Sequence, residues 1–171
     1  PSCIAGYADA QPDKRKREVA MDARMAAKVE RASIKARKEA IKTIAQLIAD
    51  AQIVFNAFIR ERDKGKGCFV CGRPFTDKPG QVQHAGHVRS RGAAGHLRFN
   101  EDNCHGECEG CNGPHGAKPH QIEAGAIRRI GTERYAALCA DNTPHKWTHD
   151  ELTAIRDTYR AKLKELKGRT C

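Results

Sequence analysis

Two pairs of cysteines are the residues of this chain whose spacing most directly indicates chemistry. Cys68 and Cys71 enclose two residues, and Cys108 and Cys111 repeat this C-x2-C spacing after 36 intervening residues. Two such pairs on tight turns complete a tetrahedral four-sulfur site. Cys104 offers another sulfur at x3 spacing from Cys108, but the matching x2 spacing favours Cys111. The sequence therefore predicts a structural Zn²⁺ bound by Cys68, Cys71, Cys108 and Cys111.

The composition favours a polyanionic partner and a reducing compartment. The 171 residues carry a net charge of +10, and basic groups near phosphates gain Coulomb energy and release counterions. A basic soluble surface is the alternative. Neither a signal peptide nor about 18 consecutive apolar residues occur, so we expect a cytoplasmic protein with no membrane partner. The eight cysteines are then metal ligands or free thiols.

A long helix is predicted over residues 13–64, broken at most once, after a flexible terminus at 1–12. Neither Pro nor Gly occurs between Asp13 and Asp63. Ile34, Ile41, Ile48 and Phe55 recur every seven residues, with Ile44, Ala51 and Phe58 in the complementary positions. This seam fits either the same helix of a second subunit, giving a homodimer, or the protein's own core.

The rest of the chain is predicted to be a metal-dependent core and a helical end. Residues 65–120 are rich in Gly, Pro and His and bury too little to fold without metal. Residues 121–171 contain two short helical stretches around Gly131 and a last helix that begins at a Thr148/Glu151 capping box and ends at Gly168. The predicted fold class is α+β and mostly α-helical.

Six sequence islands, in order and spacing, resemble the Rap (NinG) recombination endonucleases of lambdoid phages. They are "FNAFIRERD", the first C-x2-C, "HAGHVRS", "LRFNEDN", "CEGCN" and "HKWTHDEL", which together cover roughly residues 51–167. The resemblance implies a nuclease that cleaves branched DNA, such as Holliday junctions and D-loops. It also implies a zinc-stabilised ββα-metal core of the HNH, treble-clef type, similar to phage endonuclease VII, and a catalytic Mg²⁺ or Mn²⁺.

Within this resemblance, four polar residues are candidates for catalysis. His87 is the expected general base, because neutral imidazole accepts a proton near cellular pH. His84 and Asn112 are expected to bind the catalytic cation, and His105 to orient the base or bind phosphate; His115 is a weaker candidate. The alternatives are loop histidines without a role, a helix cap at Asn112 and simple packing at His105.

His84 stands where the family is expected to carry an acidic residue, and this changes the expected metal. Imidazole suits Zn²⁺, Ni²⁺, Co²⁺ or Mn²⁺, whereas carboxylates suit Mg²⁺. We therefore expect weaker dependence on Mg²⁺ than in a relative with Asp there. A second departure is that family members tend to carry a cysteine-rich N-terminal ribbon, of which only Cys3 could be a remnant.

Six basic residues are expected to hold DNA phosphates without reading sequence, although about half could be ordinary surface. They are Arg89, Arg91, Arg98, Lys118, Arg128 and Arg129. Three rival functions stay open: a DNA-binding module stabilised by zinc without catalysis, an HNH nuclease without branch selectivity, and a structural protein built on the long helix. Histidines placed between the cysteine pairs favour a nuclease over the first and third of these.

Overall fold

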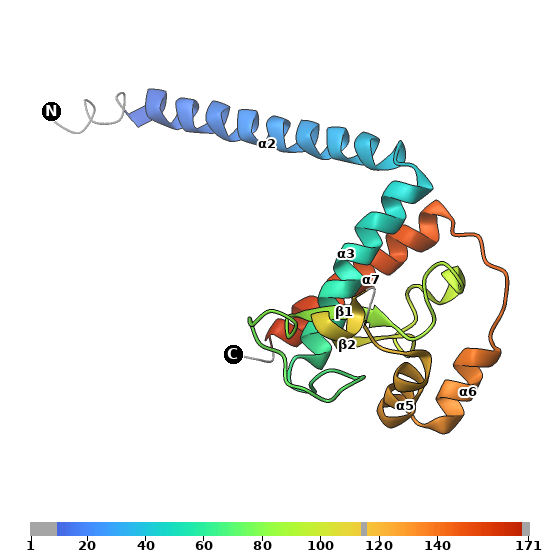
Figure 1. Cartoon of the computed structure of the whole chain (residues 1–171). Helices are drawn as coiled ribbons and strands as arrows, with labels where there is room; N and C mark the ends of the chain where they lie inside the picture. Colours follow the sequence, from blue (N-terminus) through green and yellow to red (C-terminus); the bar gives the residue numbers. More distant parts are fainter. Residues whose placement is uncertain (1–9, 114–115, 169–171) are drawn as a thin grey trace, which may run out of the picture. The chain divides into compact units, whose positions relative to one another are not determined.

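The computed structural model describes residues 10–113 and 116–168, and side chains from residue 14 onward (Figure 1). The chain forms two units, residues 1–43 and 44–171, which are treated separately. The expected flexible terminus at 1–12 lies mostly outside the described residues. No described helix is both long and apolar enough to cross a bilayer.

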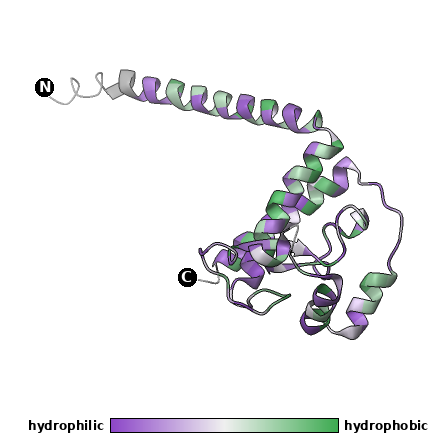
Figure 2. Ribbon diagram, viewed as in Figure 1, coloured by the Kyte–Doolittle hydropathy of each residue, from purple (hydrophilic) through white to green (hydrophobic). Residues whose placement is uncertain are grey.

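The first unit is a single described helix, α2 (Ala10–Ala40). It carries hydrophilic residues along its length with apolar ones between them (Figure 2). Four of its larger apolar side chains, Val19, Met21, Met25 and Val29, are more than half exposed, and Ile34 is 43% exposed. The predicted helix over 13–64 is therefore two helices, because Lys42 and Thr43 lie outside helical structure and α3 (Ile44–Asp63) starts afresh.

The core of the second unit forms where α3 packs against α7 (His149–Gly168), which lie side by side in Figure 1. Phe55, Phe58 and Ile59 of α3 are buried with Leu152 and Tyr159 of α7. The ring of Phe55 meets that of Tyr159 edge-on, with centroids 4.7 Å apart. The C-terminal half of the predicted heptad seam thus packs into the protein's own core, whereas Ile34 and Ile41 are exposed.

The capping box predicted for the last helix is present. The Thr148 backbone N–H donates to Glu151 Oε2 (2.8 Å), and the Glu151 N–H donates to Thr148 Oγ1 (3.3 Å). These two bonds satisfy donors that a helix start leaves without partners. The predicted C-terminal helices are confirmed as α5 (Pro119–Ile130), α6 (Thr132–Ala140) and α7.

A two-stranded antiparallel sheet lies against α3 and carries the candidate histidines. Strand β1 (Gln83–His87) pairs with β2 (Cys104–Cys108), so that His84 faces Glu107 and His87 faces Cys104. The connection contains the short 3-10 helix η1 (Gly95–Leu97), and β2 runs directly into α4 (Glu109–Asn112). The predicted mostly helical α+β class is confirmed.

The segment between α3 and β1 folds as a turn against the outer edge of β2. The Phe69 N–H donates to the carbonyl oxygen of Gly106 (2.9 Å), and the Gly72 N–H donates to that of Cys68 (2.9 Å). Gly72 has a φ of +75°, a conformation that other residues rarely adopt, so glycine permits this tight turn. The turn brings the first cysteine pair next to the end of β2.

Candidate functional site

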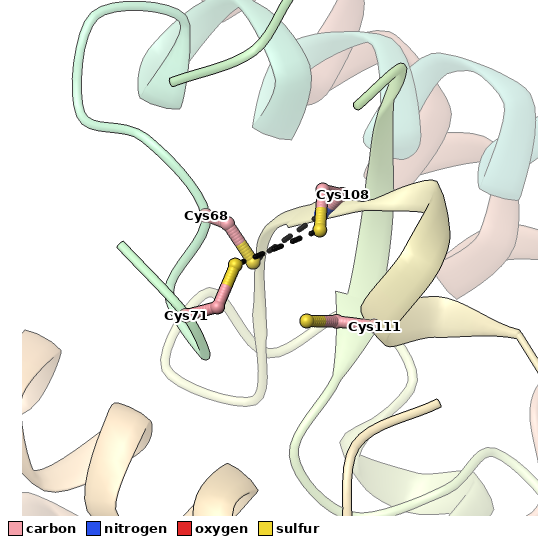
Figure 3. Close-up of side chains that lie close together, drawn as sticks. All are labelled: Cys68, Cys71, Cys108 and Cys111. Carbon is pink, nitrogen blue, oxygen red and sulfur yellow. Dashed lines mark hydrogen bonds between the residues drawn. The ribbon is translucent and has the colours of Figure 1, made fainter. Parts of the chain in front are cut away.

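The four predicted cysteines come together in one cluster. Cys68 and Cys71 lie on the turn after α3, Cys108 ends β2, and Cys111 belongs to α4 (Figure 3). All four Sγ atoms lie within 4.8 Å of one another, and the Cys71 and Cys108 sulfurs are 3.8 Å apart. Sulfurs bound to one tetrahedral zinc at about 2.3 Å are about 3.8 Å apart, so the cluster has the size of a metal site.

The backbone around the cluster also suits bound thiolates. The Cys108 N–H donates to Cys68 Sγ (3.4 Å), a contact drawn in Figure 3, and such bonds stabilise negative sulfur. Cys104 lies elsewhere, in the core beneath the sheet, with its Sγ 3.9 Å from His87 Nδ1. Four cysteines can therefore hold a metal, and the preference for Cys111 over Cys104 agrees with the geometry.

His84, His87 and Asn112, predicted from far-apart islands, line one cavity of about 360 Å³. The two histidines come from β1 and Asn112 is the last residue of α4, which contacts both strands. Asn112 does not cap the following helix, because α5 begins at Pro119 and its cap is Lys118. His115 lies outside the described residues.

Cationic and neutral polar groups line this cavity, and none of the described lining residues is acidic. Arg60 of α3 and Arg91 of the connecting loop lie beside the histidines, and Asn56, Ala85 and Ser90 complete the lining. Two guanidinium groups without a lining carboxylate attract anions, and arginine donates two parallel hydrogen bonds to phosphate. Arg60 was not among the sequence-based candidates.

Both ring nitrogens of His87 have a neighbour in the protein, and its pKa is lowered. Its Nε2–H donates to the carbonyl oxygen of Arg98 (3.0 Å), which leaves the lone pair on Nδ1, 3.9 Å from the sulfur of the buried Cys104. Burial lowers the pKa of His87, the Arg98 carbonyl opposes this, and the charges of Arg91 and Arg98 lower it further. The imidazole is therefore unprotonated over a wider pH range than an exposed histidine.

Asn103, which sequence reasoning missed, fixes the loop that follows His87. It is fully buried; its Oδ1 accepts from the Arg89 N–H (2.8 Å), and its Nδ2 donates to the carbonyls of Arg89 and Leu97 (both 3.1 Å). The Val88 N–H donates to the Asn103 carbonyl (2.8 Å). One amide thereby joins both ends of the loop that carries Ser90 and Arg91.

His105 lies apart from the other three candidates. It lines a smaller cavity of about 160 Å³ with Asp63 and Arg129, and Arg62 Nη2 donates to its Nδ1 (3.2 Å). Its Nε2–H donates to the Asp102 carbonyl (2.9 Å). Burial, followed by the charge of Arg62, lowers the pKa of His105 to about 4. These contacts make His105 a neutral packing residue, and a catalytic role for it stays a prediction without support from the geometry.

Three of the six predicted DNA-binding residues donate hydrogen bonds to backbone carbonyls of distant segments of the protein. Arg89 donates to the carbonyls of Leu138 and Asp141 at the end of α6. Arg128 and Arg129 of α5 donate to the carbonyls of Val70 (2.7 Å) and Gly67 (2.9 Å), which bind α5 to the cysteine turn.

The other three are placed differently from one another. Arg98 donates to Gln52 Oε1 (3.3 Å), and Lys118 is an exposed residue at the start of α5. Arg91 alone among the six lines the histidine cavity.

Comparison with known proteins supports the NinG family part of the resemblance seen in the sequence. The fold and site define a small α+β protein with a four-cysteine cluster that could hold a metal and a cationic histidine cavity. The family model described as Bacteriophage Lambda NinG protein matches residues 3–169. The chain belongs to this NinG family of lambdoid phages.

Relatives include the protein NinG of Escherichia phage lambda, which is 39% identical over 137 residues, or 79% of this chain. Protein NinG of Escherichia phage 933W is 38% identical over 137 residues, also 79% of the chain, and that of Salmonella phage P22 is 37% identical over 134 residues, or 78%. The chain spans 64 to 65% of the length of these relatives. No solved structure matches the chain.

Proposed function

We propose that this chain is a metal-dependent endonuclease that cleaves branched DNA, such as Holliday junctions and D-loops, in the host cytoplasm. One observation carries the proposal: His84, His87 and Asn112 share a cavity with Arg60 and Arg91. The cavity combines a neutral imidazole base with donors for an anionic substrate, which phosphodiester hydrolysis requires.

The surrounding elements support an HNH-type core for this site. A two-stranded antiparallel sheet is followed at once by a short helix, and a four-cysteine cluster lies where the two meet. In such a core His87 accepts the proton of the attacking water, while Arg60 and Arg91 hold the scissile phosphate. The His84 imidazole and the Asn112 amide oxygen would bind a divalent cation, which stabilises charge on the phosphate and the leaving oxygen.

The proposal is tested by cleavage of a synthetic four-way junction, a D-loop and a linear duplex of the same sequence. Wild type and His87→Ala are compared, with His120→Ala as the matched control, because His120 is exposed on α5. Loss of a general base costs about 10²- to 10⁴-fold in rate. We expect this loss in His87→Ala with junction binding retained, and full activity in His120→Ala.

Each rival function corresponds to a different result of this experiment. Binding by both proteins with cleavage by neither indicates a non-catalytic DNA-binding module. Equal cleavage of the linear duplex indicates a nuclease without branch selectivity. Repeating the assay with Mg²⁺, Mn²⁺, Co²⁺ or Ni²⁺ tests the effect of His84, and best activity in Mg²⁺ would contradict the expected preference for a softer metal.

A homodimer is part of this proposal, because two subunits can cut two strands symmetrically. Met21, Met25 and Val29 follow one another at helical spacing on α2, and each is at least 55% exposed. Apolar residues at this spacing fit a second copy of the helix. Sedimentation velocity is expected to show a dimer, and Met25→Glu is expected to shift it toward monomer.

A further inference from the structure

Glu107 of β2 is a buried acid that the proposed chemistry does not use. Its side chain is 5% exposed, and no hydrogen bond or ion pair to its carboxylate is found among the residues that the structure describes, so the only contact left to its oxygens is a small opening to solvent. Buried carboxylates normally have several partners, because an unpaired one loses its hydration. Asp63, also buried, shows the usual arrangement, with Arg62, Lys66 and the Gly106 N–H all bound to its oxygens.

The strand register places Glu107 directly opposite His84. Cross-strand partners in an antiparallel pair lie on the same face, with Cβ atoms about 5 Å apart. Metal–nitrogen and metal–oxygen bonds are both about 2.1 Å, so a cation that bridges the two side chains requires them to turn toward each other across the strands. The opposed pair therefore offers two donors from adjacent strands.

Gly86 makes the space that Glu107 occupies. A Cβ atom built on residue 86 would lie 1.8 Å from Glu107 Oε2, so any other residue would collide with the carboxylate. The carboxylate consequently lies against Gly86 of β1, on the face of the strand that also carries His84, and not out in solvent. Position 86 accommodates the acid because it has no side chain.

Glu107 also supplies what the histidine cavity lacks. The described lining residues include an imidazole from His84 and an amide from Asn112 but no carboxylate. A neutral donor pair beside two arginines binds a divalent cation poorly, and one carboxylate adds both a ligand oxygen and a compensating charge. An imidazole, a carboxylate and an amide oxygen together suit Mn²⁺.

We propose that Glu107 and His84, facing each other across the two strands, bind one divalent cation together with Asn112. The inference rests on the proposed function, since it completes the metal site of that reaction. It assigns the carboxylate of the site to β2, where the resemblance predicts an acidic residue on β1 at position 84.

The first test measures Mn²⁺ binding to the full-length, zinc-loaded protein by isothermal titration calorimetry. Glu107→Gln keeps the shape and removes the charge, and Glu109→Gln is the matched control, because Glu109 is exposed two residues further on. We expect one Mn²⁺ site beyond zinc, at least tenfold weaker in Glu107→Gln and unchanged in Glu109→Gln. Equal affinity of Glu107→Gln and wild type would overturn the inference.

A compensating exchange separates ligation from a packing role. His84→Asp combined with Glu107→Gln moves the carboxylate to the opposite strand at the same level of the sheet. Mn²⁺ affinity is expected to recover to within a few-fold of wild type, and Mg²⁺ binding to strengthen. A double variant as weak as Glu107→Gln would count against the paired site.

A measurement on wild type guards against variants that fail to fold. Mn²⁺ broadens the NMR signals of nuclei close to it, so the Glu107 carboxyl and His84 ring signals are expected to broaden at the lowest Mn²⁺ concentrations. Binding that leaves both signals sharp would refute the site.

The inference and the proposed function can fail independently. Mn²⁺ binding through Glu107 without DNA cleavage by wild type would keep the site and remove the nuclease. Cleavage that is unchanged in Glu107→Gln, with unchanged Mn²⁺ affinity, would keep the nuclease and remove this ligand.

Discussion

The neighbours of each histidine on the two strands decide what it can do. His87 lines the cationic cavity; it donates one N–H to a backbone carbonyl, and its other ring nitrogen lies 3.9 Å from the Cys104 sulfur. His105 uses both nitrogens internally, because Arg62 donates to Nδ1 and the Asp102 carbonyl accepts from Nε2. Protonating His105 would break the first bond and place a second positive charge beside Arg62.

The pH dependence of stability should therefore report on His105. Its pKa falls from the ordinary 6.5 to about 4 in the folded protein, which favours the neutral form. The free energy of unfolding is therefore unaffected by His105 above pH 6.5 and decreases as the pH falls toward 4. The total decrease is at most about 3 kcal/mol. Urea unfolding at several pH values should show that the free energy of unfolding decreases less between pH 6.5 and 4 in His105→Gln than in wild type.

The matched control for this measurement is His120→Gln, because His120 is exposed on α5. Its acid profile should follow that of wild type. Identical slopes between pH 6.5 and 4.5 in wild type and His105→Gln would contradict the assignment.

At the scale of elements, the end of α3 is tied to the middle of β2 by one carboxylate. Asp63 is fully buried, and its Oδ2 accepts from the Gly106 N–H (2.9 Å) and from Arg62 (2.7 Å). Burial alone would raise the pKa of Asp63, but the Arg62 contact outweighs it and holds that pKa well below its usual range. This contact fixes the distance between the helix and the strands that carry the cavity.

Removing this carboxylate should destabilise the fold strongly. Asp63→Ala leaves Arg62 partly buried with only the Glu101 carboxylate at 3.6 Å, and the Gly106 N–H without an acceptor, at a cost of about 3 kcal/mol. Chemical denaturation measures the change. Asp77→Ala, at an exposed acid in the loop before β1, is expected to change stability by less than about 0.5 kcal/mol. Similar effects of the two substitutions would show that Asp63 has no special role.

The parts of the fold that sequence could predict depend on local patterns. The cysteine pairs and the Thr148/Glu151 capping box are spacings of two or three residues, and both are found as expected. Asn103 and Glu107 were missed because their importance depends on the register between strands 16 residues apart. Arg128 and Arg129 were predicted to contact DNA. Their backbone partners within the protein lie more than 50 residues away in the sequence, so no local pattern indicates these contacts.

At the scale of the whole molecule, the cysteine cluster that could hold a metal lies in a small apolar core. The apolar cluster around it contains only Phe69, Val70 and the two cysteines Cys68 and Cys108 as buried members among the described residues. Removing zinc with a chelator, or by Cys108→Ser, should lower the thermal midpoint by at least about 10 °C. Cys139→Ser, at an exposed thiol, should leave it unchanged. A midpoint insensitive to metal would contradict a structural role.

The distribution of charge predicts a second whole-molecule effect. Residues 10–40 contain ten Lys or Arg and five Asp or Glu, so α2 holds half of the net charge of +10. If DNA binds, removing residues 1–43 should weaken binding at low salt and reduce its dependence on salt, because fewer counterions are released. Fluorescence anisotropy over a salt series measures both. An unchanged salt slope would show that α2 does not approach DNA.

The single amide of Asn103 has a consequence for how this family can vary. It joins Arg89 to Leu97 and holds both ends of the loop, while residues 91–93 between them are exposed. The pairing of β1 with β2 is therefore set at the base of the loop and is independent of the length of its tip. Insertions and deletions just beyond Arg91 should accumulate among relatives without displacing the strands, so the outer part of this tip can diversify while Arg91 and the paired strands stay constant.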